Sequence, residues 1–152
     1  MTKRPSTRTA GPPAEGVDGL IDALVQASFT VMAVLSKLGA DNDLSLTQLR
    51  VLAILRDRRV RMAVLADYLG LEKSTMTGLI DRAEKRGLVE RAPNADDGRA
   101  IDVFLSRAGA AFGERLYGDV RRALAPLTGE LGAPEQRRLQ ALLEQMLARQ
   151  GS

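Results

Sequence analysis

The sequence predicts a mainly helical protein that carries one small β-hairpin, and three observations lead to this prediction. Apolar residues, chiefly leucine and alanine, recur at helical spacing along most of the chain. The polar segment NADDG, residues 94–98, interrupts that pattern and is rich in turn-forming residues. Apolar and polar residues alternate on both sides of it, as they do in strands. The chain has 152 residues, and we expect one well-packed domain over residues 17–152.

The chain contains no cysteine and no histidine. The first absence excludes disulfides and cysteine nucleophiles, and the second removes the usual nitrogen ligands of zinc and haem. The glycine-rich motifs that bind phosphate in nucleotide-dependent enzymes do not occur in the sequence. We therefore expect no enzymatic activity, no cofactor and no metal site.

Residues 1–16 are rich in Pro, Gly, Ser and Thr, which predicts a disordered tail. This tail is basic but lacks the apolar core of a signal peptide. Elsewhere no apolar run approaches the roughly 20 residues that a membrane span needs. These features predict a cytoplasmic protein that does not associate with a membrane.

The first helix is expected over residues 17–38, where apolar residues recur every three or four positions. Gly39 is expected to end this helix. A second helix follows Ser45, which suits the N-cap position, and extends to Arg56. The polar segment that comes next, RDRRVR, is expected to be a simple connection.

A short helix at residues 62–69, a turn at Gly70 and a second helix at residues 73–86 have the spacing of a helix-turn-helix. In that motif the N-terminal part of the second helix enters the major groove of DNA. Short hydroxyl side chains lie at that end, and basic residues follow one to three turns later. The residues of this helix that we expect to contact DNA are Lys73, Ser74, Thr75, Thr77, Gly78, Arg82 and Arg86.

Gly78 lies in the middle of this second helix, where glycine costs about 1 kcal/mol relative to alanine. Two interpretations account for it equally well: DNA approaches the helix closely here, or the preceding helix packs closely against it. Two short helices joined by a tight turn also occur in helical proteins that do not bind DNA. The two helices alone therefore leave the function open.

Two predicted strands, at residues 88–93 and 100–105, enclose the polar loop directly after the second helix. A helix-turn-helix followed by a hairpin is a winged helix, expected here over residues 45–106, and the loop is its wing. Arg99 in this loop is expected to reach a minor groove of DNA. Asp97 is expected to pair with the Arg99 guanidinium and hold it in position. The alternative is an exposed ion pair of little energetic value.

Two more helices are predicted after the hairpin. Ser106 is expected to cap a long helix that runs through Leu127, and Pro134 lies in the first turn of a last helix. The last helix carries an apolar stripe, as does the segment 17–38. One small winged-helix core cannot cover both stripes, and the simplest partner for them is a second copy of the chain.

At this point the chain resembles the multiple antibiotic resistance regulator (MarR) family of winged-helix transcription factors. The resemblance lies in LADYLGLEKSTMTGLIDRAEKRGLVER, residues 65–91, and in DDGRAIDVFLSRAG, residues 96–109. There are two departures from the family pattern. Arg61 stands where a serine or threonine often opens the first short helix, and Ala83 replaces a commoner leucine.

The resemblance implies a homodimer joined through helices at residues 17–39 and 107–150, which presents two recognition helices to a pseudo-palindromic operator in double-stranded DNA. It also implies a small anionic or phenolic ligand, bound between these helices and the DNA-binding lobe. The candidate pocket residues are Phe29, Met32, Arg50, Phe112 and Arg115. Ordinary core packing is the alternative role for the phenylalanines and the methionine. The missing cysteine and histidine exclude the thiol-oxidation mode of the family and disfavour its zinc mode.

The expected function is therefore that of a dimeric, ligand-responsive transcription repressor, and not of an enzyme. The alternative is a winged-helix protein-interaction module that does not bind DNA. Residues 44–106 hold 11 basic and 9 acidic residues, so the placement of charge has to decide between the two. Convergence of Arg82, Arg86 and Arg99 on one surface favours DNA, whereas an uncharged, apolar recognition helix would favour the alternative.

Overall fold

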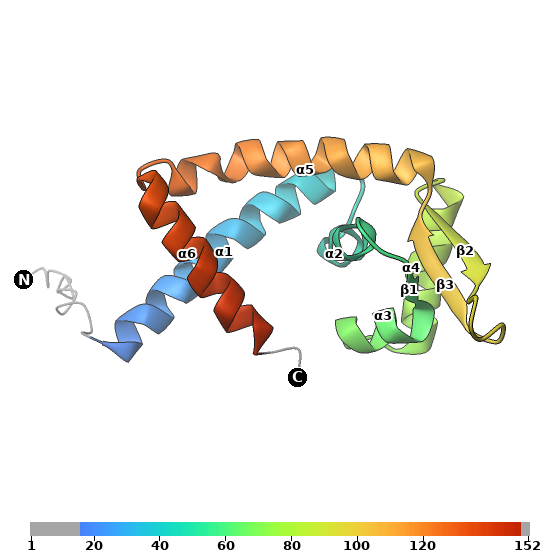
Figure 1. The fold of residues 1–152 in the computed structure, drawn as a ribbon. Helices are drawn as coiled ribbons and strands as arrows, with labels where there is room; N and C mark the ends of the chain where they lie inside the picture. Colours follow the sequence, from blue (N-terminus) through green and yellow to red (C-terminus); the bar gives the residue numbers. More distant parts are fainter. Residues whose placement is uncertain (1–15, 150–152) are drawn as a thin grey trace, which may run out of the picture. The chain divides into compact units, whose positions relative to one another are not determined.

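The computed structural model describes residues 16–149, and these residues form six α-helices and three β-strands (Figure 1). The predicted fold class, mainly helical with a small β-hairpin, is confirmed. The disordered tail predicted for residues 1–16 lies outside the described residues, except for Gly16. In chain order the elements are α1 (Val17–Asp41), α2 (Leu46–Leu55), β1 (Val60–Arg61), α3 (Met62–Leu69), α4 (Lys73–Lys85), β2 (Val89–Pro93), β3 (Ile101–Leu105), α5 (Arg107–Thr128) and α6 (Ala133–Ala148).

The chain divides into two compact units between Ala33 and Val34, inside α1. The described part of the first unit, residues 16–33, is the amino-terminal part of α1, and it carries six exposed large apolar residues. These residues are Val17, Leu20, Ile21, Val25, Phe29 and Met32. The second unit begins at Val34 and holds the end of α1 and all the other elements.

One described helix, α1, is long and apolar enough to cross a membrane when length and composition alone are considered. Its mean hydropathy reaches 1.6, so the expectation that no segment approaches a membrane span was wrong on this criterion. The expectation failed because it looked for an unbroken apolar run, whereas α1 intersperses small and hydroxyl residues among large apolar ones. A helix whose apolar side chains are covered by another protein has the same composition.

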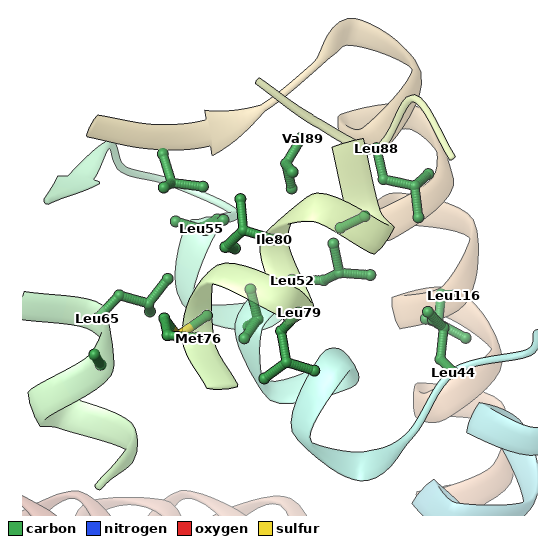
Figure 2. Packing of buried hydrophobic residues seen from close by; sticks show 14 residues of the cluster. Leu44, Leu52, Leu55, Leu65, Met76, Leu79, Ile80, Leu88, Val89 and Leu116 are labelled. Carbon is green, nitrogen blue, oxygen red and sulfur yellow. The ribbon is translucent and has the colours of Figure 1, made fainter. Parts of the chain in front are cut away.

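The core of the second unit lies between α2, α3, α4 and the sheet, and Leu116 of α5 closes one side of it (Figure 2). Leu65, Met76, Ile80 and Val103 are completely buried. Burial of side chains of this size stabilises the fold by about 1.5–3 kcal/mol each. The buried residues of α4 are spaced three and four positions apart, so the core determines how this helix is rotated. They are Met76, Leu79, Ile80 and Ala83.

The sheet has three antiparallel strands in the order β1-β3-β2. The predicted hairpin is present, with Arg91 of β2 opposite Val103 of β3. The expectation of a simple connection at residues 56–61 was wrong at its end, because Val60 and Arg61 pair with Val103 and Asp102 on the other edge of β3. A strand of two residues has too few positions to show alternation, so the local pattern could not predict it.

The end of α1 differs from the prediction at Gly39, which does not end the helix. The helix continues to Asp41, and the Leu44 amide then donates a hydrogen bond to the Gly39 carbonyl over 2.8 Å. A Cβ atom at Gly39 would lie only 2.6 Å from the Leu44 carbonyl oxygen, so the turn requires glycine there for space. The residue with the left-handed conformation is Asp43, with φ of 56°.

The other predicted helix boundaries follow local capping. Ser45 forms a capping box with Gln48 at the start of α2, and Ser106 accepts a hydrogen bond from the Gly109 amide at the start of α5. Gly70 and Gly87 have positive φ and follow α3 and α4. The predicted positions of these caps and stops are confirmed.

The hairpin and α5 are joined by direct backbone contact. The Ser106 amide donates to the Leu88 carbonyl over 3.1 Å, and the Ser106 hydroxyl donates to the Gly87 carbonyl. A Cβ atom at Gly109 would overlap the Leu88 carbonyl oxygen. Glycine at position 109 therefore lets the first turn of α5 lie directly against the start of the hairpin.

We predict that Gly109→Ala destabilises the protein by about 2–3 kcal/mol, because the added methyl group forces α5 away from backbone that cannot yield. Gly113→Ala is the matched control in the same helix, since a Cβ atom at that position meets nothing within 4 Å. The control should stabilise the protein by up to about 1 kcal/mol through helix propensity. Urea unfolding of both variants measures the difference, and equal stabilisation by the two substitutions would contradict the close contact.

Candidate nucleic-acid interface

The amino-terminal end of α4 is open on the surface of the protein. Glu72 occupies the N-cap position, and its side chain makes no capping hydrogen bond. Lys73, Ser74 and Thr75 follow, and all three are exposed. The first amide groups of a helix have no partner within the helix and favour anions, so this end combines free donors, a cation and two hydroxyl groups.

Thr77 and Gly78 lie one turn further along α4. The Thr77 hydroxyl donates to the Lys73 carbonyl over 2.9 Å, which fixes the side chain against the helix. A Cβ atom at Gly78 would meet only the Arg82 guanidinium, at 3.7 Å. Of the two interpretations of Gly78, close packing against the preceding helix is therefore wrong. Because Gly78 has no side chain, the surface of α4 at this position is open and can be approached closely.

Arg91 of β2 joins the hairpin to the recognition helix α4. Its guanidinium lies 2.9 Å from the Asp81 carboxylate and forms a second, very short ion pair with Glu84. The hydrogen bond to Glu84 is the main reason why the pKa of Arg91 is raised above its ordinary value, and it outweighs the opposing effect of burial. One arginine of the hairpin thereby pairs with two carboxylates on α4 and offsets part of their negative charge.

Asn94 organises the loop of the hairpin. Its side-chain oxygen accepts hydrogen bonds from the amides of Asp96 and Asp97, each over 3.0 Å. Its amide nitrogen donates to the buried carboxylate of Asp102 over 2.9 Å, and Arg61 donates to the same Asn94 oxygen over 3.2 Å. Sequence reasoning identified the turn but not this residue, although asparagine two or three positions before turn amides is the usual signal of such a turn.

The predicted ion pair between Asp97 and Arg99 is wrong. No such pair occurs in the part of the chain that the structure describes, and the Asp97 carboxylate accepts a hydrogen bond from the backbone amide of Arg99 over 3.1 Å. An aspartate two positions before an amide in a turn reaches that amide more easily than a long guanidinium. Asp97 thus shapes the loop backbone and leaves the exposed Arg99 side chain directed by the loop alone.

A hollow of about 630 Å³ lies between α4, the start of α3 and the hairpin. It brings together Lys73 and Thr77 of α4 with Arg99 of the hairpin loop, and Arg61 and Arg91 also line it. Residues from both parts of the predicted DNA-binding surface therefore share one concave, cationic site. A negatively charged strand fits this combination of shape and charge.

Arg82 and Arg86 lie outside this hollow and differ in their surroundings. Arg82 is exposed on α4 beside Gly78. Arg86 follows the last residue of α4, and its guanidinium donates to the carbonyls of Asn42 and Asp43, each over 3.0 Å. The structure thus gives Arg86 protein partners that sequence reasoning did not foresee.

Comparison with known proteins places this geometry in a family. A model described as MarR family matches residues 42–100. The multiple antibiotic resistance protein MarR of Escherichia coli (strain K12) is 34% identical over 107 residues, which cover 69% of this chain and 74% of MarR. The chain belongs to the MarR family.

A further relative and a solved structure support this membership. The homoprotocatechuate degradative operon repressor of Escherichia coli is 26% identical over 132 residues, which cover 86% of this chain and 89% of the repressor. The crystal structure of a mutant MarR from E. coli complexed with operator DNA has a TM-score of 0.61 and 27% identity, and covers 88% of this chain and 99% of that chain. MarR family members are transcription regulators with a winged-helix fold, and not enzymes.

The candidate ligand residues of this MarR family member occur in both units. Phe29 and Met32 are exposed on the first unit. In the second unit, the Arg50 guanidinium lies 5.5 Å from the centre of the Tyr68 ring, and the Arg115 guanidinium lies 5.8 Å from that of Phe112. Phe112 also packs against the core, which agrees with its alternative role in ordinary core packing. Their role as a ligand pocket stays a prediction.

We predict that Asn94→Ala destabilises the protein by about 1–3 kcal/mol, because the buried Asp102 carboxylate and two turn amides lose their partner. Amide hydrogen exchange at Asp96 and Asp97 should become faster in the variant. Asp96→Ala is the control in the same loop, and it should change the stability by no more than about 0.5 kcal/mol. Unchanged exchange at both amides would show that Asn94 does not hold the loop.

Proposed function

We propose that this MarR family member is a dimeric, cytoplasmic transcription repressor that binds a pseudo-palindromic operator in double-stranded DNA. One observation carries the proposal: α4 and the hairpin loop contribute Lys73, Thr77 and Arg99 to a single cationic hollow. The proposed DNA-binding lobe is residues 45–106. Regions 17–39 and 107–150 are the proposed dimerisation regions, within a domain of residues 17–152.

The chemistry of the surface supports contact with two adjacent grooves. The hydroxyl groups of Ser74 and Thr75, with Gly78 one turn later, suit the major groove, where a helix reads base edges at close approach. Arg99 at the loop suits the minor groove, whose negative potential attracts arginine. The hollow between them then faces the phosphate backbone that separates the two grooves.

The exposed part of α4 is polar and cationic, which weighs against the alternative of a protein-interaction module. Arg82 and Lys73 are both exposed, and in residues 16–149 neither side chain takes part in an ion pair. An interaction module would need apolar anchors on this helix, whereas its apolar residues are buried in the core. The MarR complex with operator DNA supports the same conclusion.

Dimerisation is supported by exposed apolar side chains near both ends of the chain. The described part of the first unit exposes six large apolar residues on α1. In the second unit, α6 has no buried residue and exposes Leu139, Leu142, Leu143, Met146 and Leu147. Surfaces of this kind usually mark a partner, and a two-fold dimer would present two α4 helices to half-sites about one helical turn apart.

We also propose that a small anionic or phenolic compound releases the protein from its operator. Arg50 and Arg115 would supply the cationic partners, and Phe29, Met32 and Phe112 the apolar ones. The operon repressor among the relatives is named for the degradation of homoprotocatechuate, which is itself a phenolic acid. Melting temperatures measured with a panel of aromatic acids would identify such a ligand, since binding to the folded state alone stabilises it.

We predict that Arg99→Ala weakens operator binding by about 1–3 kcal/mol, because a contact in the minor groove is lost. Asp97→Ala should weaken binding less, since the arginine remains while its backbone amide loses a partner. The double variant should be no weaker than Arg99→Ala. Fluorescence titration on one operator duplex measures all three. Wild-type affinity in Arg99→Ala, at an unchanged melting temperature, would show that the hairpin is not a DNA-contacting wing.

We predict that Leu143→Glu dissociates the dimer, because a charge would have to be buried in an apolar interface. Ala141→Glu places the same charge on the same helix, about 160° away around its axis, and should leave the dimer intact. Sedimentation velocity at micromolar concentration distinguishes the two variants. A folded wild-type monomer at that concentration, or a Leu143→Glu variant that associates normally, would contradict dimerisation through α6.

A further inference from the structure

We propose that Arg86 is a positioning residue that connects the recognition helix α4 to the end of α1, and that it does not contact DNA. The inference rests on the proposed function and deepens it. The Arg86 guanidinium donates one hydrogen bond to the Asp43 carbonyl and one to the Asn42 carbonyl, each over 3.0 Å. Two donors of one side chain thus grip two successive backbone carbonyls across more than 40 positions of sequence.

The acceptors are available because of how α1 ends. The Leu44 amide donates to the Gly39 carbonyl over 2.8 Å, and the Asp43 amide donates to the Ala40 carbonyl over 3.1 Å. These two bonds close the helix and leave the next carbonyls, those of Asn42 and Asp43, beyond its end. Carbonyls at a helix C-terminus carry partial negative charge, so a guanidinium is a suitable partner for them.

The apolar contact beside Arg86 is incompletely packed. A void of about 10 Å³ lies between α2 and α4, and Leu44, Ala83 and Arg86 are among the residues that line it. This volume is at the lower limit for a single water molecule. The small side chain of Ala83, where the family more often has leucine, leaves this contact between α2 and α4 incompletely filled. The Arg86 hydrogen bonds therefore add a polar connection between the end of α1 and α4 beside an apolar contact that is not completely filled.

The same geometry argues against a DNA contact by Arg86. Two of the five N–H donors of its guanidinium already bind protein carbonyls, and these bonds orient the side chain toward the end of α1. Arg82, one turn earlier, has no such partner in the described residues, and its guanidinium lies beside Gly78. Arg82 is the better candidate for a phosphate contact, which makes it the control for Arg86.

The position of Arg86 gives it a role in how the two halves of an operator are read. The carbonyls that Arg86 binds directly follow α1, and residues 17–39 are one of the two proposed dimerisation regions. Two recognition helices in a dimer must match half-sites about one helical turn apart. A bond between α4 and the end of α1 restricts the movement of each recognition helix within its subunit, and so sharpens the spacing that the dimer accepts.

The first experiment compares Arg86→Gln, Arg86→Lys and Arg82→Gln on an operator duplex selected from random DNA with the wild-type protein. The salt dependence of affinity reports the number of phosphates neutralised, and loss of one contact reduces the slope by about one. Arg82→Gln should reduce the slope. Both Arg86 variants should bind several-fold more weakly with the wild-type slope. A reduced slope in Arg86→Gln, or wild-type affinity in Arg86→Lys, would overturn the proposal, because lysine can still contact a phosphate as a point charge but does not reproduce the guanidinium fork that binds both carbonyls.

The second experiment changes the operator by inserting or removing one base pair between its half-sites. The wild-type protein should lose at least tenfold in affinity, and Arg86→Gln should lose only two- to threefold. A general loss of stability would not relax this preference. Equal losses in the two proteins would overturn the positioning role.

The third experiment needs no DNA and so separates this inference from the proposed function. Amide hydrogen exchange at Asp43 and Leu44 should become at least fivefold faster in Arg86→Gln and stay unchanged in Arg82→Gln. If the wild-type protein binds no duplex DNA, the proposed function fails, while exchange at these amides still tests the connection. Unchanged exchange in Arg86→Gln would overturn it.

Discussion

Burial of one face of α4 is the constraint on which the rest of the site depends. Met76 and Ile80 are completely buried, and Leu79 and Ala83 complete the same face, so the helix cannot rotate without exposing all four to water. Because the rotation of α4 is fixed, each of its remaining side chains points in a set direction. Asp81 and Glu84 meet the hairpin, whereas the end of the helix turns Arg86 toward the end of α1. The apolar core thus decides which polar residues can act together.

The contacts that hold the hairpin to α4 also offset negative charge on this helix. Asp81 and Glu84 lie on a helix that we propose to bind a polyanion, and each would repel phosphate. Arg91 pairs with both, so the hairpin offsets part of their negative charge and is positioned by the same bonds. This leaves Arg61, Lys73 and Arg99 to supply positive charge to the hollow. The net charge of residues 44–106 is small because several of their charged residues form ion pairs that position neighbouring side chains.

The elements that local chemistry specifies were predictable from the sequence, and those that depend on distant backbone were not. Gly70 and Ser106 act within a few residues, so their signals are visible in sequence. Gly39 was misread because its role is to admit the Leu44 carbonyl, which no local rule reveals. Strand β1 depends on the free edge of β3, more than 40 positions away. Within the site, the helix and loop residues of the DNA-contact prediction were named from the sequence, but Asn94 was missed, and the partners of Asp97 and Arg86 were assigned only by the structure.

The two sides of α4 are attached by different kinds of contact, and this difference bears on how a regulator of this kind would respond to a ligand. On the hairpin side, Arg91 forms ion pairs with Asp81 and Glu84 of α4, and these charge-assisted contacts hold the hairpin to the helix. On the other side, two hydrogen bonds from an exposed arginine span a small void. A ligand shifts an equilibrium only by binding one arrangement better than another. The side that costs less to rearrange is the one joined to α1, so we expect α4 and its hairpin to move together as one body relative to that helix.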